Sequence, residues 1–190
     1  MIVKETKFQG LFQIELKPIL DERGFFMRTY DHDLLEAYGM NREWLQENHS
    51  YNKNKGTIRG FHFQFPPFSE TKLVRVVSGT IIDFFIDLRK NSQTFGEWGS
   101  IELSSSNNIA LYIPRGFAHG MCTMEDDSTM VYKVDNTYSP NHEGTIKWND
   151  PTLKISWPSF KNPIISEKDS NSPSFQSFLR EHKSLELNNE

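Results

Sequence analysis

Two short stretches of the chain carry the residue types best suited to chemistry. The first, from Arg59 to Arg75, sets His62 and Lys72 among apolar residues that are typical of β-strands. The second, from Ile113 to Gly120, places His119 beside turn-forming proline and glycine residues. Two histidines and a lysine framed in this way predict a pocket in a small β-barrel. Proton transfer, metal binding and anion binding all fit such a pocket.

A metal site is the first of these alternatives to test. The P-x-G-x-x-H segment that ends at His119 resembles the second half of the metal-binding motif of cupin barrels. The first half of that motif carries a His-x-His pair and a nearby carboxylate, whereas His62 is followed by Phe-Gln. Two histidines without a third nitrogen or oxygen ligand make a poor metal site, so the ligand count predicts no metal. The structural alternative for His119 is a histidine that bonds a loop carbonyl.

Arg59, His62 and Lys72 together suit the removal of a proton from carbon in an anionic substrate. An arginine fork binds phosphate, a neutral imidazole takes the proton, and an ammonium group stabilises the developing enolate. Strict alternation along a strand would put Arg59 and His62 on opposite faces. If both side chains reach one pocket, we expect a bend or bulge near Gly60.

Two further side chains have both a structural and a catalytic interpretation. Tyr132 lies in T-M-V-Y-K-V, where alternation puts it on one face with Met130 and Val134 and turns Lys133 away. We expect Tyr132 to face inward, either as a core aromatic residue or as a proton donor. From composition alone, Asp169 in S-E-K-D is expected to be a surface-loop carboxylate.

The elements that must position these residues are short strands. Segments rich in Val, Ile, Phe and Tyr recur between turn formers, which is the pattern of a sandwich or barrel. The predicted strands are 11–16, 25–30, 57–63, 73–77, 80–88, 98–103, 109–113 and 129–135. Ranges 73–77 and 80–88 predict a hairpin, because Gly79 between them supplies the positive φ that its turn needs. The pattern fits a jelly roll best.

Little helix is expected. A short peripheral helix is predicted from about Asp33 to Tyr38, with Asp31 or Asp33 as its N-cap. Gly39 stops it by accepting a left-handed conformation. The polar residues 171–190 predict a loosely held tail with one amphipathic turn near Phe175.

Length and composition indicate one domain, which we place over residues 1–170. The chain has 190 residues, 36% of them hydrophobic and 24% charged, which suffices for a sizeable core. A net charge of -4 argues against a nucleic-acid partner. Cys122 is the only cysteine, so no intramolecular disulfide forms. The N-terminal residues lack a signal-peptide pattern, and no segment approaches the roughly 20 apolar residues of a membrane span. We expect a cytoplasmic protein that does not bind membranes.

Many short motifs, in order and spacing, resemble those of the dTDP-4-dehydrorhamnose 3,5-epimerase family. They are D-E-R-G-F-F (21–26), Q-E-N-H-S (46–50), R-G-F-H-F-Q (59–64), K-L-V-R (72–75), I-D-L-R-K (86–90), I-P-R-G-F-A-H-G (113–120), V-Y-K (131–133), W-N-D-P (148–151) and S-E-K-D (166–169). The resemblance implies an all-β, cupin-type jelly-roll barrel with a few short peripheral helices. It also implies a homodimer that acts without metal or organic cofactor on a nucleotide-linked 4-keto-6-deoxy sugar, most commonly a dTDP-sugar.

The resemblance assigns roles to particular residues. The base of the family is the histidine of R-G-x-H, here His62, and the aspartate of S-x-K-D that orients it is Asp169. The proposed acid is the tyrosine of the Y-K pair, here Tyr132, and the lysine beside the keto oxygen is Lys72. The residues that match positions lining the nucleotide and sugar site are Arg23, Phe26, Gln46, Asn48, Arg59, His119, Tyr138 and Lys168.

The implied reaction inverts C3 and C5 of dTDP-4-keto-6-deoxy-D-glucose through enolates. Its product, dTDP-4-keto-L-rhamnose, serves deoxysugar and cell-surface polysaccharide biosynthesis. Three alternatives stay open: a mono-epimerase acting at C3 or C5 of a related nucleotide sugar, a non-catalytic cupin that binds sugar nucleotides, and a metal-dependent cupin enzyme. Arg28 stands where the family usually has Glu, so the nucleotide also stays open. Phe61 and Phe63 replace the usual Leu and Tyr and are expected to reshape the sugar pocket.

Overall fold

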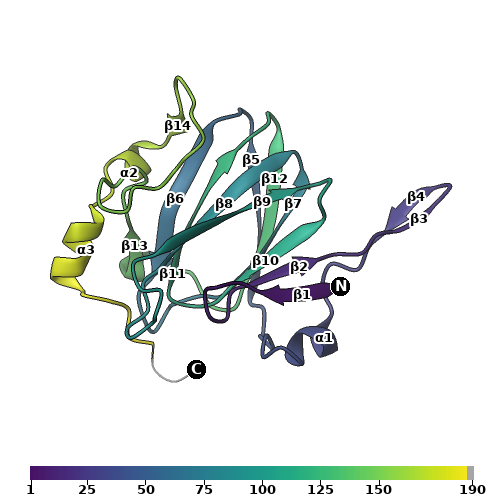
Figure 1. Ribbon diagram of the computed structural model, residues 1–190, viewed down its shortest axis with the longest axis horizontal. Helices are drawn as coiled ribbons and strands as arrows, with labels where there is room; N and C mark the ends of the chain where they lie inside the picture. Colours follow the sequence, from purple (N-terminus) through teal and green to yellow (C-terminus); the bar gives the residue numbers. More distant parts are fainter. Residues whose placement is uncertain (188–190) are drawn as a thin grey trace.

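The computed structural model describes residues 1–187, and in this part of the chain two antiparallel sheets face each other as a sandwich (Figure 1). The first sheet has the order β1 (Ile2–Glu5), β2 (Phe12–Glu15), β10 (Ile109–Ile113), β7 (Lys72–Ser78), β12 (Ser128–Val134), β5 (Gln46–Asn52). The second has the order β13 (Glu143–Thr145), β6 (Thr57–Gln64), β11 (Phe117–Thr123), β8 (Thr80–Asp87), β9 (Trp98–Ser104), and β14 (Ile164–Ile165) pairs with β6 in parallel. The chain crosses repeatedly between the sheets, as in a double-sheet jelly roll, and confirms the predicted fold class.

Smaller elements surround this sandwich. Strands β3 (Ile19–Asp21) and β4 (Gly24–Phe26) form a separate two-stranded arm that projects away from the sheets (Figure 1). The helical segments are α1 (His32–Glu36), the 3₁₀ turn η1 (Pro140–His142), α2 (Glu167–Ser170) and α3 (Phe175–Glu181). No helix among the described residues is long and apolar enough to cross a membrane.

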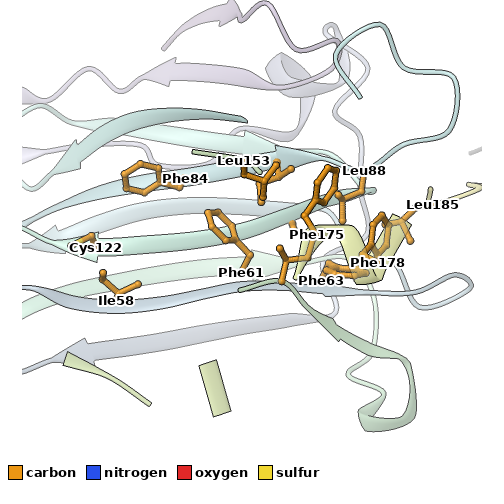
Figure 2. Packing of buried hydrophobic residues seen from close by; sticks show 13 residues of the cluster. Ile58, Phe61, Phe63, Phe84, Leu88, Cys122, Leu153, Phe175, Phe178 and Leu185 are labelled. Carbon is orange, nitrogen blue, oxygen red and sulfur yellow. The ribbon is translucent and has the colours of Figure 1, made fainter. Parts of the chain in front are cut away.

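The hydrophobic core has more than one layer, because the second sheet is covered on both faces. Between the sheets, side chains such as Val74, Phe85 and Met130 pack together. On the outer face of the second sheet, Phe61 and Phe84 pack against Trp157. Phe175, Phe178 and Leu185 of the C-terminal segment belong to the same cluster (Figure 2). Strands buried on both faces carry continuous apolar runs in place of alternation. Every residue of β11 is buried, which explains why the sequence pattern predicted a turn around His119 and missed this strand.

The predicted hairpin between 73–77 and 80–88 is wrong. Both strands exist, but β7 pairs with β10 and β12 in the first sheet, whereas β8 pairs with β9 and β11 in the second. Gly79 does turn the chain with a φ of +74°. A Cβ on Gly79 would collide with Ser128, so the turn also requires glycine for space. A tight turn therefore connects facing sheets here, and local turn chemistry does not distinguish this from a hairpin.

The predicted helix near Asp33 is confirmed. Its N-cap is Asp31, whose side chain accepts a hydrogen bond from the backbone N–H of Leu34 at 3.2 Å. Helix α1 ends at Glu36, and Gly39 follows with a φ of +74°. The helix covers the outer face of the first sheet, where Leu35 is buried beside Tyr112 and Leu73.

The expectation of a loosely held C-terminal tail is wrong for residues 171–187. Phe175, Phe178 and Leu185 are buried in the cluster that covers the second sheet. The backbone N–H of Leu185 also donates a hydrogen bond to the carbonyl of Leu88, just beyond β8, and the carbonyl of Leu185 accepts one from the N–H of Lys90. The apolar residues of an otherwise polar segment thus close the outer layer of the core (Figure 2). Residues 188–190 lie outside the described part of the chain, and the domain boundary near residue 170 stays a prediction.

Candidate active site

A β-bulge brings Arg59 and His62 to the same pocket. Along β6 and β11, His62 pairs with His119 and Arg59 pairs with Met121, so three steps on β6 match two on β11. The extra residue reverses the alternation of side chains, as expected near Gly60. Gly60 has a φ of +118°, and a Cβ there would lie 2.5 Å from the Cα of Gly120. Glycine at this position therefore allows two neighbouring strands to approach closely behind the pocket.

His62 forms a hydrogen-bonded pair with Asp169. Its Nε2 lies 2.7 Å from Oδ1 of Asp169, which stands on the short helix α2. The other carboxylate oxygen accepts a hydrogen bond from the backbone N–H of Gly60 at 3.1 Å. The side chain of Asp169 is 4% exposed and that of His62 is 36% exposed, so the imidazole reaches the cavity while the carboxylate lies behind it. The sequence-based expectation of a surface carboxylate at Asp169 is wrong, because α2 packs against β6.

Opposing effects set the pKa of Asp169. Burial alone would raise this pKa, but the hydrogen bond and the charge of His62 lower it. Hydrogen bonds with the backbone N–H of Gly60 and with the Ser166 side chain lower it further, so that together these effects outweigh burial. The pKa of Asp169 is therefore held below its ordinary value, and the carboxylate is charged at neutral pH. A charged carboxylate at Nε2 favours the tautomer with hydrogen on Nε2, which leaves Nδ1 of His62 as the proton acceptor.

Tyr132 and Lys72 lie on the opposite sheet. Lys72 on β7 is buried, forms an ion pair with Glu70, and places its Nζ 5.8 Å from the centre of the Tyr132 ring. Tyr132 on β12 faces inward, as predicted, and lines the same cavity as Met130. Burial raises the pKa of Tyr132, and the charge of Glu70 adds to this effect while Arg59 opposes it. The phenol therefore keeps its proton at neutral pH and can donate it.

His119 is buried on β11, next to His62 in the strand register. Its Nε2 lies 2.7 Å from Oδ2 of Asp83 on β8. The structural interpretation of His119, a histidine bonded to a loop carbonyl, is thus wrong, since its partner is a carboxylate. Asp83 escaped sequence reasoning, although a charged residue within the apolar run T-I-I-D-F-F-I-D was a usable signal. Glu70, the partner of Lys72, was also missed.

The predicted binding residues on β5 face the pocket side of the first sheet. Gln46, Asn48 and Ser50 alternate inward, and Asn48 stands opposite Tyr132 in the register. The Nε2 of Gln46 donates a hydrogen bond to the carbonyl of Asn136 at 3.0 Å. Asn48 and Ser50 therefore extend the polar wall that begins at Tyr132.

Tyr138 and Lys168 meet at the carboxylate of Glu143. The Tyr138 hydroxyl donates to one oxygen at 3.3 Å, and the Lys168 ammonium lies 2.6 Å from the other. Lys168 directly precedes Asp169 on α2, so Lys168 and its two partners lie beside the His62–Asp169 pair. Tyr138 is 58% exposed and offers its ring to solvent.

Arg23 and Phe26 are not brought to the pocket within this chain. Both belong to the projecting arm of β3 and β4, away from the sandwich (Figure 1). Arg23 pairs with Asp21, and its side chain is 86% exposed. Phe26 is 67% exposed. Arg28, just beyond β4, pairs with Asp31 at the start of α1 at 2.6 Å.

Five of the predicted site residues, Arg59, His62, Lys72, His119 and Tyr132, meet at one cavity of about 180 Å³. It is lined by Ser50, Arg59, His62, Lys72, His119, Gly120, Met121, Met130 and Tyr132. A histidine with a charged carboxylate partner on one sheet faces a protonated phenol and an ammonium group on the other. This arrangement can remove a proton from one face of a carbon and return a proton to the opposite face. Nowhere in residues 1–187 do three or more His, Cys, Asp or Glu side chains form a group that could hold a metal ion.

Comparison with known proteins agrees with this geometry. The family model described as dTDP-4-dehydrorhamnose 3,5-epimerase matches residues 5–177. A dTDP-4-dehydrorhamnose 3,5-epimerase from Shigella flexneri is 43% identical over 176 residues, which cover 92% of this chain and 96% of that protein. The resemblance noted in the sequence motifs is thereby confirmed.

Solved structures are similar over nearly the whole fold. The dTDP-4-dehydrorhamnose 3,5-epimerase from Bacillus anthracis, solved with TDP and PPi bound, is 42% identical with a TM-score of 0.88, over 92% of this chain and 99% of that one. The dTDP-6-deoxy-D-glucose-3,5-epimerase from Legionella pneumophila, in complex with dTDP-4-keto-L-rhamnose, is 32% identical with a TM-score of 0.90, over 99% of each chain.

Proposed function

The chain belongs to the dTDP-4-dehydrorhamnose 3,5-epimerase family, and from this premise we propose that it inverts C3 and C5 of dTDP-4-keto-6-deoxy-D-glucose to give dTDP-4-keto-L-rhamnose. The observation that carries the proposal is the cavity between the sheets. The His62–Asp169 pair lies on one wall, and Tyr132 with Lys72 lies on the other. Such a site catalyses an isomerisation by proton transfer alone.

The chemistry follows from the ketone at C4 of the substrate. The C–H bonds at C3 and C5 are both adjacent to this ketone, so either proton is acidified in the same way. Nδ1 of His62 takes the proton, the electron pair of the C–H bond moves to the C4 oxygen, and the ammonium of Lys72 stabilises the enolate. Tyr132 then donates its proton to the carbon from the opposite face, which inverts the centre. One base and one acid serve both carbons in turn, once His62 has released its proton to water and Tyr132 has taken one from water between the two inversions.

Asp169 supports the base in two ways. It fixes the tautomer of His62 by accepting from Nε2, and its negative charge stabilises the imidazolium that forms when Nδ1 takes the proton. The backbone N–H of Gly60 holds the second oxygen of the carboxylate, so the imidazole is oriented by the bulge itself. We assign base function to His62 and orientation to Asp169.

The nucleotide and diphosphate are assigned to the rim of the cavity. Arg59 presents a guanidinium, held by the side-chain oxygen of Asn52 at 2.7 Å, that matches phosphate oxygens in charge and shape. Gln46, Asn48, Tyr138 and Lys168 complete the proposed contacts at the rim, and His119, deeper in the cavity, is a proposed contact of the sugar. The Bacillus anthracis relative was solved with TDP bound, which supports a thymidine nucleotide as the ligand of this rim.

We further propose a homodimer in which the arm of one chain reaches the site of the other. The arm exposes large apolar side chains: Ile19, Leu20, Phe25 and Phe26 are each more than 60% exposed. A two-stranded ribbon with this much exposed apolar surface is marginal on its own and calls for a partner surface. Arg23 and Phe26 would then contact a substrate bound in the partner's cavity, which accounts for their distance from their own.

Deuterium exchange tests the proposed reaction directly. The protein is incubated with dTDP-4-keto-6-deoxyglucose in D₂O, and deuterium at C3 and C5 is followed by NMR and mass spectrometry. Incorporation at both carbons with formation of the L-rhamno product is the expected result. Incorporation at only one carbon would identify a mono-epimerase. No incorporation, together with tight dTDP binding, would identify a binding protein and refute the proposal.

A further inference from the structure

A second carboxylate–imidazole pair lies behind the same cavity. His119 on β11 is the cross-strand neighbour of His62, and its Nε2 lies 2.7 Å from Oδ2 of Asp83 on β8. The side chain of Asp83 is fully buried, and that of His119 is 10% exposed and lines the cavity. The function proposed above gives His119 a substrate contact but gives Asp83 no role.

A comparison along β8 shows how unusual the surroundings of Asp83 are. Asp87, four residues further on and equally buried, accepts hydrogen bonds from Arg89, Ser92 and Thr94. That network satisfies both of its oxygens and suits a structural carboxylate. Within the described residues, Asp83 has one hydrogen-bond partner, the imidazole of His119, and its Oδ1 has none.

Such burial is costly for the fold. An unpaired carboxylate oxygen in the interior loses its hydration without compensation. Burial raises the pKa of Asp83, and the nearby charges of His119 and Lys72 act in the opposite direction. His119 and Lys72 both line the cavity. Fold stability therefore gives little reason for an aspartate at this position, whereas the orientation of a pocket side chain does.

We propose that Asp83 is a positioning residue, whose carboxylate holds His119 as an imidazolium donor beside Lys72, where both donors meet the oxygen that becomes negative during epimerisation. This inference rests on the proposed function. It deepens that function by adding a second donor to the oxyanion site and a second buried carboxylate to the machinery. The two pairs then have opposite tasks, since His62 receives a proton from carbon while His119 keeps its proton.

The chemical balance of the step is simple. When Nδ1 of His62 takes the proton from C3 or C5, the electron pair of the C–H bond moves onto the C4 oxygen. Lys72 and the Nδ1–H of His119 donate hydrogen bonds to this oxygen, and Nε2–H of His119 donates to Asp83. No bond to Asp83 or His119 forms or breaks. When the carbon is reprotonated, the negative charge leaves the oxygen and both donors return to their starting state.

A double-mutant cycle tests the proposal. The variants are Asp83→Asn, His119→Ala and the double variant, each assayed for deuterium incorporation at C3 and C5 and for dTDP binding by calorimetry. Asp87→Asn is the matched control, since it neutralises an equally buried carboxylate on the same strand. We expect Asp83→Asn to slow incorporation at both carbons by about tenfold, which is below the roughly 10²- to 10³-fold loss for removal of an oxyanion donor.

The cycle separates positioning from structure. If Asp83 acts through His119, Asp83→Asn adds no further loss in the His119→Ala background, and dTDP binding stays unchanged. The control Asp87→Asn is expected to lower the melting temperature without slowing the exchange. Wild-type exchange rates in Asp83→Asn, or losses that multiply in the double variant, would overturn the role of Asp83 while leaving the proposed function intact. Failure of the wild-type protein to exchange any proton would remove both.

A measurement on the wild-type protein keeps the proposal testable should Asp83→Asn not fold. The Nε2–H of His119 is observed by long-range ¹H–¹⁵N correlation before and after addition of a dTDP-linked 6-deoxy sugar that lacks the ketone. We expect a ring N–H protected from solvent exchange by the burial of Asp83, and we expect it to shift when the sugar binds. A ring N–H that does not respond to the sugar would mean that the pair is only structural.

Discussion

The replacement Asp169→Asn tests the base assignment most sharply, because it removes a charge and leaves the shape of the site almost unchanged. The carboxylate contacts Nε2 of His62 at 2.7 Å and is itself nearly inaccessible to solvent. Its negative charge stabilises the imidazolium formed in the transition state for deprotonation. Asparagine can also present its N–H₂ group to Nε2, which would favour the wrong tautomer and leave Nδ1 without a lone pair.

The expected size of the effect follows from the exposure of the pair. Asparagine in place of the aspartate of a fully buried hydrolytic triad costs about 10⁴-fold in turnover. The imidazole of His62 is 36% exposed, so water supplies part of the stabilisation that the carboxylate otherwise provides alone. We therefore expect a smaller loss, on the order of 10²- to 10³-fold, within the range for general base catalysis. Deprotonation at C3 and at C5 is expected to slow together, since both use the same imidazole.

The assay is the initial rate of deuterium incorporation at each carbon, with product formation measured in parallel. The matched control is Asp150→Asn, because Asp150 is similarly buried but bonds only backbone N–H groups of Thr152, Leu153 and Phe175. That variant is expected to lose stability and keep its exchange rate. A rate near the wild-type value in a folded Asp169→Asn protein would refute the assignment of His62 as the base oriented by Asp169.

Three further outcomes are expected from the same site. Tyr132→Phe is expected to keep more proton exchange than epimerisation, because His62 still removes protons while delivery from the opposite face is impaired; equal loss of both would argue against a dedicated donor. Gly60→Ala places a Cβ 2.5 Å from the Cα of Gly120 at a φ of +118°, so we expect a loss of more than about 1 kcal/mol in unfolding free energy and a loss of activity. Gly39→Ala is the control for that variant, since Gly39 also has a positive φ but an added Cβ would meet nothing within 4 Å. Denaturant unfolding of both variants therefore separates the cost of backbone strain from the cost of the steric clash with Gly120. Because the pKa of Asp169 is lowered on folding, its charge contributes stability that is fully present above the ordinary aspartate pKa of about 3.9 and is lost as the pH falls through the lowered value. We therefore measure the unfolding free energy of wild type and of Asp169→Asn from neutral pH downward, and we expect wild type to lose stability relative to the variant only in that acidic window. A difference in unfolding free energy that stays constant at all pH values would contradict the lowered pKa of Asp169.

Much of the site was predictable from sequence because its residues sit in short strands with strong local signals. Alternation placed Tyr132 on the inner face of its strand, and the chemistry of Arg59 and His62 required the irregularity at Gly60 that the structure contains. Asp169 was assigned to the surface from its neighbours alone, and only the family resemblance connected it with His62. A contact between residues that are more than one hundred positions apart leaves no local pattern.

The errors have a common physical origin in burial by distant segments. Strand β11 is covered on both faces, so alternation is absent and its glycine and alanine residues suggested a turn. Residues 171–187 look polar, yet three apolar side chains among them complete the outer layer of the core. The arm that carries Arg23 shows the reverse, because its apolar residues suggest a buried strand from sequence but are exposed to solvent in the single chain. These exposed apolar residues are the ones that the proposed homodimer would cover.

The proposed acid and the proposed base lie on different sheets, and this placement is what would make inversion geometrically available. His62 is fixed to the second sheet by β6, and Tyr132 is fixed to the first by β12, so a sugar ring between them presents one face to each. The separation of the two groups is set by the core that holds the sheets apart. Met121 and Met130 belong to that core and also line the cavity. A misplacement of about 1 Å can cost roughly 10²-fold in rate, so we expect the packing of these methionines to affect the rate although neither is a proposed acid or base.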